Sequence, residues 1–209
     1  MHTAAALLDC RYHNLRPSLS LLGGGISLVE GRLHEACGPA RWSFAAWVAG
    51  AVQSSRQGPV LWLHLGWQGD PLNPPGLAAF CAPERFLFVA ISKMDDMLWS
   101  MEESLRAGCA PLVVADAAEL PTLTQVRRLH LACEQGAGVL GVPPLGLLLT
   151  PGEKGGAPGV ESRWHLAPRH KAAHAGWHLS RLRARTAPEA QFSVGLGPKG
   201  PVCGPAHKS

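Results

Sequence analysis

The chain has 209 residues, enough for one domain that buries most of its apolar surface. Its hydrophobic fraction of 46% is ordinary for a globular protein, whereas its charged fraction of 16% is low. The start of the chain resembles no secretory signal, and no stretch is long and apolar enough to span a bilayer. These features argue against secreted and membrane-spanning classes, and a cytoplasmic location is expected.

The net charge of +4 is unevenly distributed. The segment from Glu161 to Ser209 contains eight lysines and arginines but only two acidic residues. A basic end suggests nucleic acid or an acidic protein surface as a partner, and a solvated basic tail explains it as well. The six cysteines contain no CxxC pair and several lie in apolar runs, which indicates buried thiols in a reducing compartment.

In chain order, residues 1–18 carry no strong pattern and are expected to form an N-terminal segment. An apolar stretch with a glycine hinge at 23–25 then leads into a predicted strand at 33–36. The turn Cys37-Gly38-Pro39 follows this strand. Phe44, Trp47, Val48 and Val52 then form the apolar stripe of an amphipathic helix.

Near-continuous apolar runs predict four more buried strands, at 60–65, 86–91, 111–115 and 145–150. Between them, helical periodicity begins at Met94 and again near Thr122, and the second helix is expected to end at Gly136. The alternation of buried strands and helices predicts an α/β fold with a mostly parallel sheet flanked by helices.

The pattern changes after Pro151. Apolar and polar residues alternate at 162–167, 177–185 and 191–194, which predicts antiparallel strands that extend the sheet. The expected domain therefore covers residues 19–195, with 161–195 as its antiparallel part. Residues 196–209, rich in glycine and proline, are expected to be a disordered tail.

The stretch around the first turn has the outline of a phosphate loop, in which backbone N–H groups and a helix N-terminus hold an anion. The Walker form requires two separated glycines, a lysine and a serine or threonine. Here Gly38 is followed by Pro39, which has no N–H. Trp42 and Ser43 occupy the positions of the lysine and the hydroxyl residue. The expectation is a phosphate loop without the means to bind phosphate.

Two other groups of residues are candidate sites. Asp116 ends a buried strand, where a Walker-B carboxylate would hold magnesium, although an aspartate that caps the next segment is favoured. Arg181, Arg183 and Arg185 alternate along a predicted strand, so they are expected to share one face and contact a partner or DNA. A solvated edge strand is the competing explanation. Histidines at 170, 174 and 178 would align on a helix as zinc ligands, but Pro168 and Gly176 interrupt this segment. No metal site is therefore expected.

The segment LSLLGGGISLVEGRLHEACGP resembles the entry to a RecA-type ATPase core, where a GR(I/L)-x-E-x-x-GP strand precedes the Walker loop. The segments WSMEESLRAGCAPLVVAD and LPTLTQVRRLHLACEQG, and the C-terminal RWHLAP and WHLSRLRARTAPEAQFSV, are similar to those of the ImuA family. Members of that family are RecA/SulA-like accessory factors of bacterial damage-induced mutagenesis. The resemblance extends from about Leu19 to Val194.

The resemblance implies a role in translesion synthesis within the SOS response. The implied partners are an ImuB-like inactive relative of Y-family polymerases, an error-prone replicative-type polymerase and RecA. Trp42 and Ser43 fall at the Walker positions and no glutamate ends VLWLHL, so only Asp116 remains of the catalytic set. A non-enzymatic RecA-fold adaptor without ATP as a cofactor is therefore expected. A residual nucleotide-binding ATPase and a SulA-type inhibitor of cell division stay open as alternatives.

Overall fold

The computed structural model describes residues 17–68, 72–171, 174–198 and 200–204. The strands within these ranges are β1 (Ser18–Leu21), β2 (Ile26–Val29), β3 (Leu33–Cys37), β4 (Val60–Leu65), β5 (Phe86–Ile91), β6 (Leu112–Asp116), β7 (Leu145–Leu149), β8 (Ser162–Pro168), β9 (Gly176–Ala184), β10 (Ala190–Gly197) and β11 (Gly200–Cys203). The helices are α1 (Arg41–Ser55), α2 (Pro74–Leu77), α3 (Met94–Arg106) and α4 (Leu123–Leu140). Short 3-10 turns are η3 (Leu22–Gly24), η4 (Gly66–Gln68) and η5 (Pro83–Arg85).

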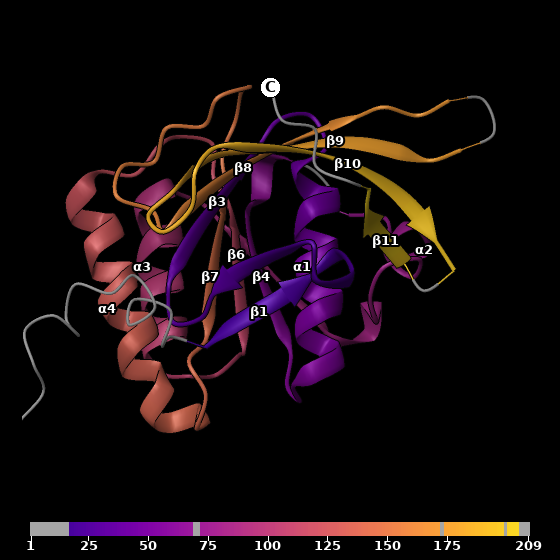
Figure 1. Ribbon diagram of the computed structural model, residues 1–209. Helices are drawn as coiled ribbons and strands as arrows, with labels where there is room; N and C mark the ends of the chain where they lie inside the picture. The colour runs from indigo at the N-terminus through magenta and orange to yellow at the C-terminus, as the bar shows by residue number, and fades with distance from the viewer. Residues whose placement is uncertain (1–16, 69–71, 172–173, 199, 205–209) are drawn as a thin grey trace, which may run out of the picture.

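One 9-stranded sheet organises the molecule, in the order β11-β10-β9-β8-β3-β7-β6-β4-β5 (Figure 1). Strands β8, β3, β7, β6, β4 and β5 pair in parallel, and β8 to β11 pair antiparallel. The expected α/β fold with a mostly parallel sheet and antiparallel C-terminal strands is confirmed. The region 161–195 needs one correction, because β8 runs parallel to β3 and only its other side pairs antiparallel, with β9.

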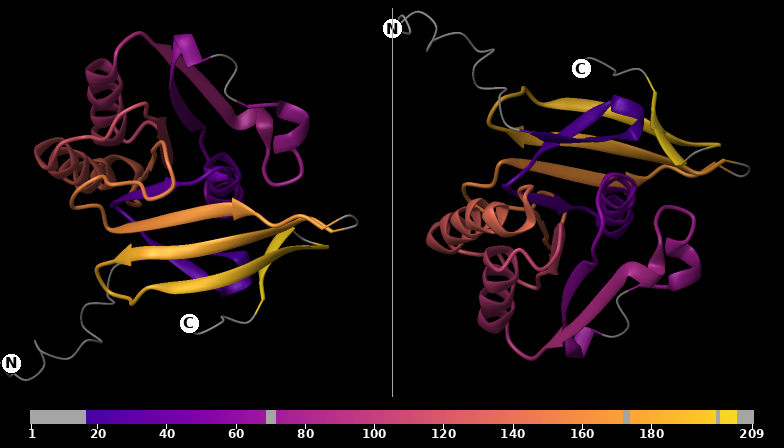
Figure 2. Two further views of the ribbon diagram at one scale, coloured as in Figure 1. Left: turned by 90° about the horizontal axis from the view of Figure 1, so that it is seen from above. Right: turned by 90° about the horizontal axis from the view of Figure 1, so that it is seen from below.

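Helices cover both faces of the sheet, as the additional views show (Figure 2). Helices α3 and α4 pack on one face, where Met97, Met101 and Leu129 are buried against strand residues such as Leu63. Helix α1 and the β1–β2 hairpin cover the other face, with Phe44 at the centre of the core. The inner parallel strands β3, β6 and β7 are therefore buried on both faces, as their continuous apolar composition requires. The expectation of a buried strand at 86–91 is wrong, because β5 lies at the sheet edge and most of its residues are exposed. Within the described ranges, no helix combines the length and apolar character needed to cross a bilayer.

The hairpin β1–β2 was not anticipated from the glycine-rich stretch. Its apolar residues alternate, and those at 19, 21, 26 and 28 are buried against α1. Gly23 and Gly24 adopt positive φ angles of 68° and 91°, which reverse the chain between the two strands. Of the expected N-terminal segment 1–18, residues 1–16 lie outside the described residues, and Ser18 already belongs to β1.

The expected disordered tail at 196–209 is wrong for its described part. Strand β10 continues to Gly197, and β11 returns antiparallel to it, with Val194 opposite Cys203. Gly200, at φ 116°, stands at the start of the returning strand in a conformation that favours glycine. Glycine and proline here mark a tight hairpin rather than a loss of order, and residues 205–209 lie outside the described residues.

Helix α4 also extends beyond its expected end. It begins with a capping box, in which Thr122 and Gln125 exchange side-chain to backbone hydrogen bonds, and it continues through Gly136 to a left-handed C-cap at Gly141. A Cβ atom at Gly136 would lie 2.0 Å from the Leu105 carbonyl oxygen of α3. Gly136 is therefore a close-packing point between two helices and not a terminator.

Candidate functional site

The turn between β3 and α1 lies at the carboxyl end of the central parallel strand, the place where open α/β sheets bind ligands. Its backbone N–H groups, however, are engaged within the protein. Gly38 N–H donates to the Gly152 carbonyl at 3.0 Å, and Ala40 N–H donates to the Leu166 carbonyl at 3.0 Å. Pro39 between them has no N–H to donate. These two N–H groups are therefore engaged within the protein and do not point at an anion.

Gly38 has a packing reason to be glycine. Its φ is 88°, and a Cβ atom there would lie 2.6 Å from the His165 ring and 2.7 Å from the Leu166 carbonyl oxygen. Strand β8, which runs parallel to β3, thus passes the turn at close range. The glycine that resembles part of a phosphate loop serves the contact between the turn and its neighbouring strand.

Trp42 and Asp116, two of the residues singled out in the sequence, are brought together. The Trp42 indole Nε1–H donates to Asp116 Oδ2 at 2.8 Å, and Arg41 Nε lies 3.7 Å from Asp116 Oδ1, an ion pair too long for a hydrogen bond. The Arg41 guanidinium also stacks over the Trp42 ring at 4.5 Å. Ser43 lies in the first turn of α1, where its N–H donates to the Ala40 carbonyl. The start of α1 and the end of β6 are therefore joined through Trp42, Arg41 and Asp116.

Asp116 is buried at the end of β6, with a relative exposure of 4%. Burial raises its pKa above the ordinary value, and the Trp42 hydrogen bond, Arg41 and His64 oppose that rise. The carboxylate is held by the Trp42 hydrogen bond and the charge of Arg41, and it is shielded from solvent. Its role in the structure is to anchor the start of α1 to the end of β6.

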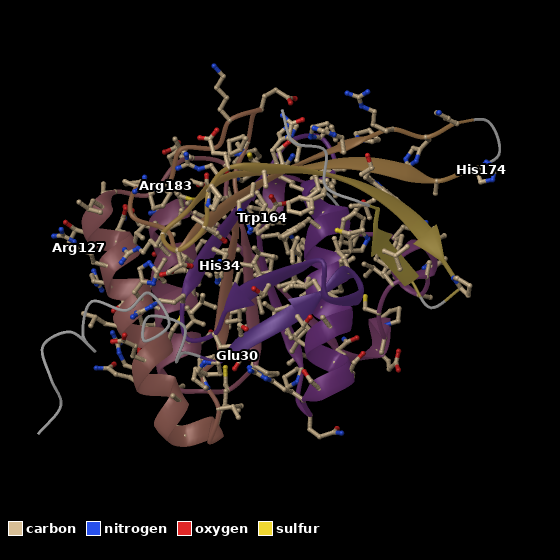
Figure 3. All side chains as sticks on the ribbon, viewed as in Figure 1. Glu30, His34, Arg127, Trp164, His174 and Arg183 are labelled. Carbon is tan, nitrogen blue, oxygen red and sulfur yellow. The ribbon has the colours of Figure 1, made fainter. Side chains whose placement is uncertain are left out.

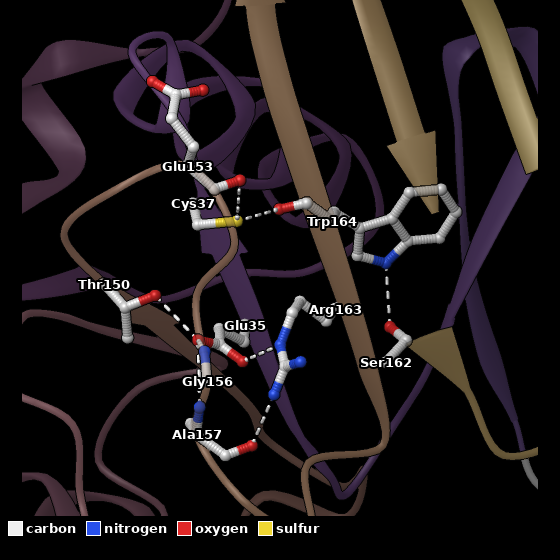
Figure 4. Close-up of polar contacts among 9 residues, drawn as sticks. All are labelled: Glu35, Cys37, Thr150, Glu153, Gly156, Ala157, Ser162, Arg163 and Trp164. Carbon is white, nitrogen blue, oxygen red and sulfur yellow. Dashed lines mark hydrogen bonds and ion pairs between the residues drawn. The ribbon is translucent and has the colours of Figure 1, made fainter. Parts of the chain in front are cut away.

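A second polar cluster lies beside the turn, centred on Glu35 of β3 (Figure 4). Glu35 is fully buried and accepts hydrogen bonds from Thr150 Oγ1 at 2.7 Å, Gly156 N at 2.8 Å and Arg163 Nε at 2.5 Å. Arg163 continues to the Ala157 carbonyl. The carboxylate therefore connects β3 to β8 and to the loop that joins β7 with β8. Both of its oxygens already accept hydrogen bonds from these segments.

Cys37, the last residue of β3, is equally enclosed. Its thiol contacts the Trp164 carbonyl oxygen at 3.5 Å, and burial raises its pKa to about 12. A protonated, buried thiol is not a nucleophile. The expectation of buried thiols is confirmed for Cys37 and Cys133, whereas Cys109 is exposed and Cys10 lies outside the described residues.

Arg181, Arg183 and Arg185, in and just after β9, do not share one face, contrary to expectation. A β-bulge separates two register pairs, Arg163 opposite Arg183 and Trp164 opposite Arg181, so Leu182 is the extra residue. Arg181 therefore lies on the face of Trp164, with its guanidinium 5.6 Å from that ring. Arg183 lies on the opposite face and is exposed (labelled in Figure 3). Arg185 follows at the strand's end, where its Nη2 donates to the Gly159 carbonyl.

Sequence reasoning did not identify the Glu35–Arg163 pair or the hydrogen-bonded pair His34 and Ser162. Each pair is separated by 128 positions, so no local spacing links its members. Glu35 did carry a signal, because it is the glutamate of the GR(I/L)-x-E-x-x-GP stretch. That stretch suggested the neighbourhood of a nucleotide site, and the structure gives Glu35 a fully paired, buried role.

The fold and the site together define an open α/β protein whose central strand–turn–helix is filled by its own side chains and backbone. No family model matches the chain. Two curated sequences named "Protein ImuA", from Caulobacter vibrioides strains NA1000 / CB15N and ATCC 19089 / CIP 103742 / CB 15, are each similar to it. Each is 31% identical over 157 residues, which cover 70% of this chain and 61% of the relative. The chain thus spans less than two thirds of the length of the relatives it matches.

Proposed function

We propose that the chain is an ImuA-family protein with a RecA-type core and degenerate Walker motifs, acting as a non-catalytic adaptor in damage-induced mutagenesis. The observation that most supports this proposal is the hydrogen bond from Trp42 to Asp116. It supports the proposal because Trp42, aligned with the Walker lysine, has an indole in place of a cation and engages Asp116, the residue aligned with the Walker-B carboxylate. The similarity to the two ImuA sequences supports the biological setting.

The proposed task is to join other proteins in an error-prone translesion complex of the SOS response. The implied partners are an ImuB-like inactive polymerase relative, an error-prone replicative-type polymerase and RecA. Arg183 and Arg185 are the proposed contact with an acidic partner surface, since Arg183 is exposed and free of any carboxylate within 4 Å among the described residues. Arg181, which lies on the other face, is removed from this proposed surface.

Nucleotide binding tests the non-catalytic part of the proposal. Titration calorimetry of the full chain with millimolar ATP and magnesium is expected to give no measurable heat of binding. The reason is that the N–H groups of Gly38 and Ala40 already donate to protein carbonyls. A micromolar dissociation constant would refute the proposal and favour a nucleotide-binding protein.

Partner binding tests the adaptor part. The tagged chain is expected to retain the polymerase-like relative from its own genome, and the double variant Arg183→Ala/Arg185→Ala should associate more slowly at low salt. The matched control Lys93→Ala/Arg127→Ala removes two exposed cations elsewhere and should bind normally. The arginines contact DNA instead if the double variant still binds the partner but its dependence on salt changes. In that case the slope of log affinity for single-stranded DNA against log salt concentration falls by about two units.

A further inference from the structure

A cavity of about 650 Å³ lies between the β1–β2 hairpin and the antiparallel part of the sheet. Its lining comes from β1 and β2, from the start of β3 and β8, and from the end of β9 with the turn after it. The β3–α1 turn lies at the carboxyl end of β3, so this cavity belongs to the opposite end of the strand. Its volume is in the range of small-molecule sites, about 300–1,000 Å³.

The inner wall of the cavity is a fixed chain of neutral polar groups (His34 and Trp164 are labelled in Figure 3). Trp164 Nε1–H donates to Ser162 Oγ at 2.8 Å, and Ser162 Oγ lies 2.6 Å from His34 Nδ1. His34 Nε2 lies 2.8 Å from the Val29 carbonyl oxygen, to which it must donate. Burial lowers the pKa of His34 to about 4, so the ring is neutral at pH 7 and Nδ1 accepts from Ser162. The wall is polar and pre-organised but carries no charge.

The charge of the cavity comes from three arginines and one carboxylate. Glu161 lies 3.8 Å from Arg32 and 3.7 Å from Arg185, and Arg32 also pairs with Glu134 at 2.6 Å. Arg181 differs, because no carboxylate of the described chain lies within 4 Å of its guanidinium. Its Nε donates to the Pro188 carbonyl, and its plane is held over the rings of Trp164 and Phe192 at 5.6 and 5.9 Å.

A half-buried guanidinium beside two aromatic rings, with its terminal nitrogens unpaired within the described chain, is suited to bidentate binding of a carboxylate or phosphate group. The hydroxyl groups of Ser18, Ser27 and Thr186 line the same cavity and can donate to further oxygens. We propose that this cavity is a binding site for a small ligand that carries a phosphate or carboxylate group, with Arg181 as its anion-binding residue. The proposal is independent of the adaptor function and would survive its failure.

The test follows the indole N–H signal of Trp164 in ¹⁵N-labelled full chain during titration with inorganic pyrophosphate or with citrate, at constant ionic strength. The signal is assigned by its loss in Trp164→Phe. Saturable shifts are expected with at least one probe, and the better probe separates phosphate from carboxylate chemistry. Arg181→Gln keeps a polar side chain but shortens it and removes its charge, and should weaken binding by about tenfold or more.

Arg183→Gln is the matched control, since it removes the same charge from the opposite face of the same strand. Binding that weakens in the Arg181 variant and persists in the Arg183 variant supports the proposal. Absence of saturable shifts with both probes would overturn it. Equal weakening in both variants would also overturn it, because it would mean a general response to net charge. Unchanged unfolding midpoints of the two variants verify that each is folded.

Discussion

At the scale of single residues, the contact between Trp42 and Asp116 defines the arrangement of side chains beside the β3–α1 turn. The single indole N–H of Trp42 donates to a buried carboxylate beside this turn. The sequence could indicate that the lysine position was filled by an indole. It could not indicate that the indole would bind Asp116, because the contact joins residues 74 positions apart.

Trp42→Phe keeps a ring beneath Arg41 but removes the donor to Asp116. We expect a loss of about 1–3 kcal/mol in the free energy of unfolding at pH 7, because a buried carboxylate loses its short hydrogen bond from the indole. Urea unfolding measures the loss. Trp99→Phe, at a side chain exposed to 60%, is the control and should stay within about 0.5 kcal/mol of wild type. Equal stability of both variants would contradict the assigned role of the hydrogen bond.

Asp116→Asn should reveal the electrostatic cost of burying the carboxylate. Because the pKa of Asp116 is raised in the folded state, the folded chain holds this proton more tightly than the unfolded chain does. Wild type therefore loses stability as the pH rises above the unfolded value of about 3.9. Asparagine can still accept from Trp42 and carries no charge. The variant should be more stable than wild type at pH 7, and the difference should vanish near pH 4.

Urea unfolding midpoints between pH 4 and pH 7 measure this difference. A variant that is less stable than wild type at pH 7 would show that the ion pair with Arg41 outweighs the cost of burial.

At the scale of elements, the parallel core was predictable because its strands are continuous apolar runs. Strands β4 and β5 have the bounds expected from the sequence, Val60–Leu65 and Phe86–Ile91. The sequence-based predictions were wrong where they depended on the role of a glycine or on the register of a strand. The glycines at 23–25 and 200 make hairpins, Gly136 makes a helix contact, and the bulge at Leu182 separates arginines that a regular strand would keep together. Each depends on a partner distant in sequence, so local pattern carries little information about it.

The buried carboxylate of Glu35 holds together β3, β8 and the loop between β7 and β8. Glu35→Ala should cost roughly 3–5 kcal/mol, because Arg163 and the N–H groups of Gly156 and Ala157 lose their acceptor. We also expect faster proteolysis between β7 and β8. Glu153→Ala is the control in the same loop, where the side chain is exposed to 72% and its side-chain partner among the described residues is His165. A small effect in both variants would mean that the loop is held by other contacts.

At the scale of the whole molecule, the two edges of the sheet are unlike. Strand β11 is short and contains a proline, which limits pairing with another chain, whereas β5 has the uncharged sequence FLFVAI. On β5, Leu87 is exposed to 54% and Phe88 to 41%. An edge of this kind is prone to pair with other strands.

Leu87→Lys should therefore reduce the concentration-dependent association of the purified chain, as measured by sedimentation velocity. Val139→Lys, at a position of α4 exposed to 69%, introduces the same charge away from the edge and should have less effect. Equal reduction by both substitutions would attribute the change to net charge rather than to the edge.

The bulge in β9 also bears on how this chain can be matched with others. Because Leu182 is an additional residue, the positions before and after it follow two different alternation frames. A relative with a regular strand here would be matched correctly only with a one-residue gap at 182. Without that gap, residues on the Arg181 face of this strand would be aligned with residues on the opposite face of the relative's strand. Correspondence in β9 must therefore be judged by strand register rather than by the count of residues.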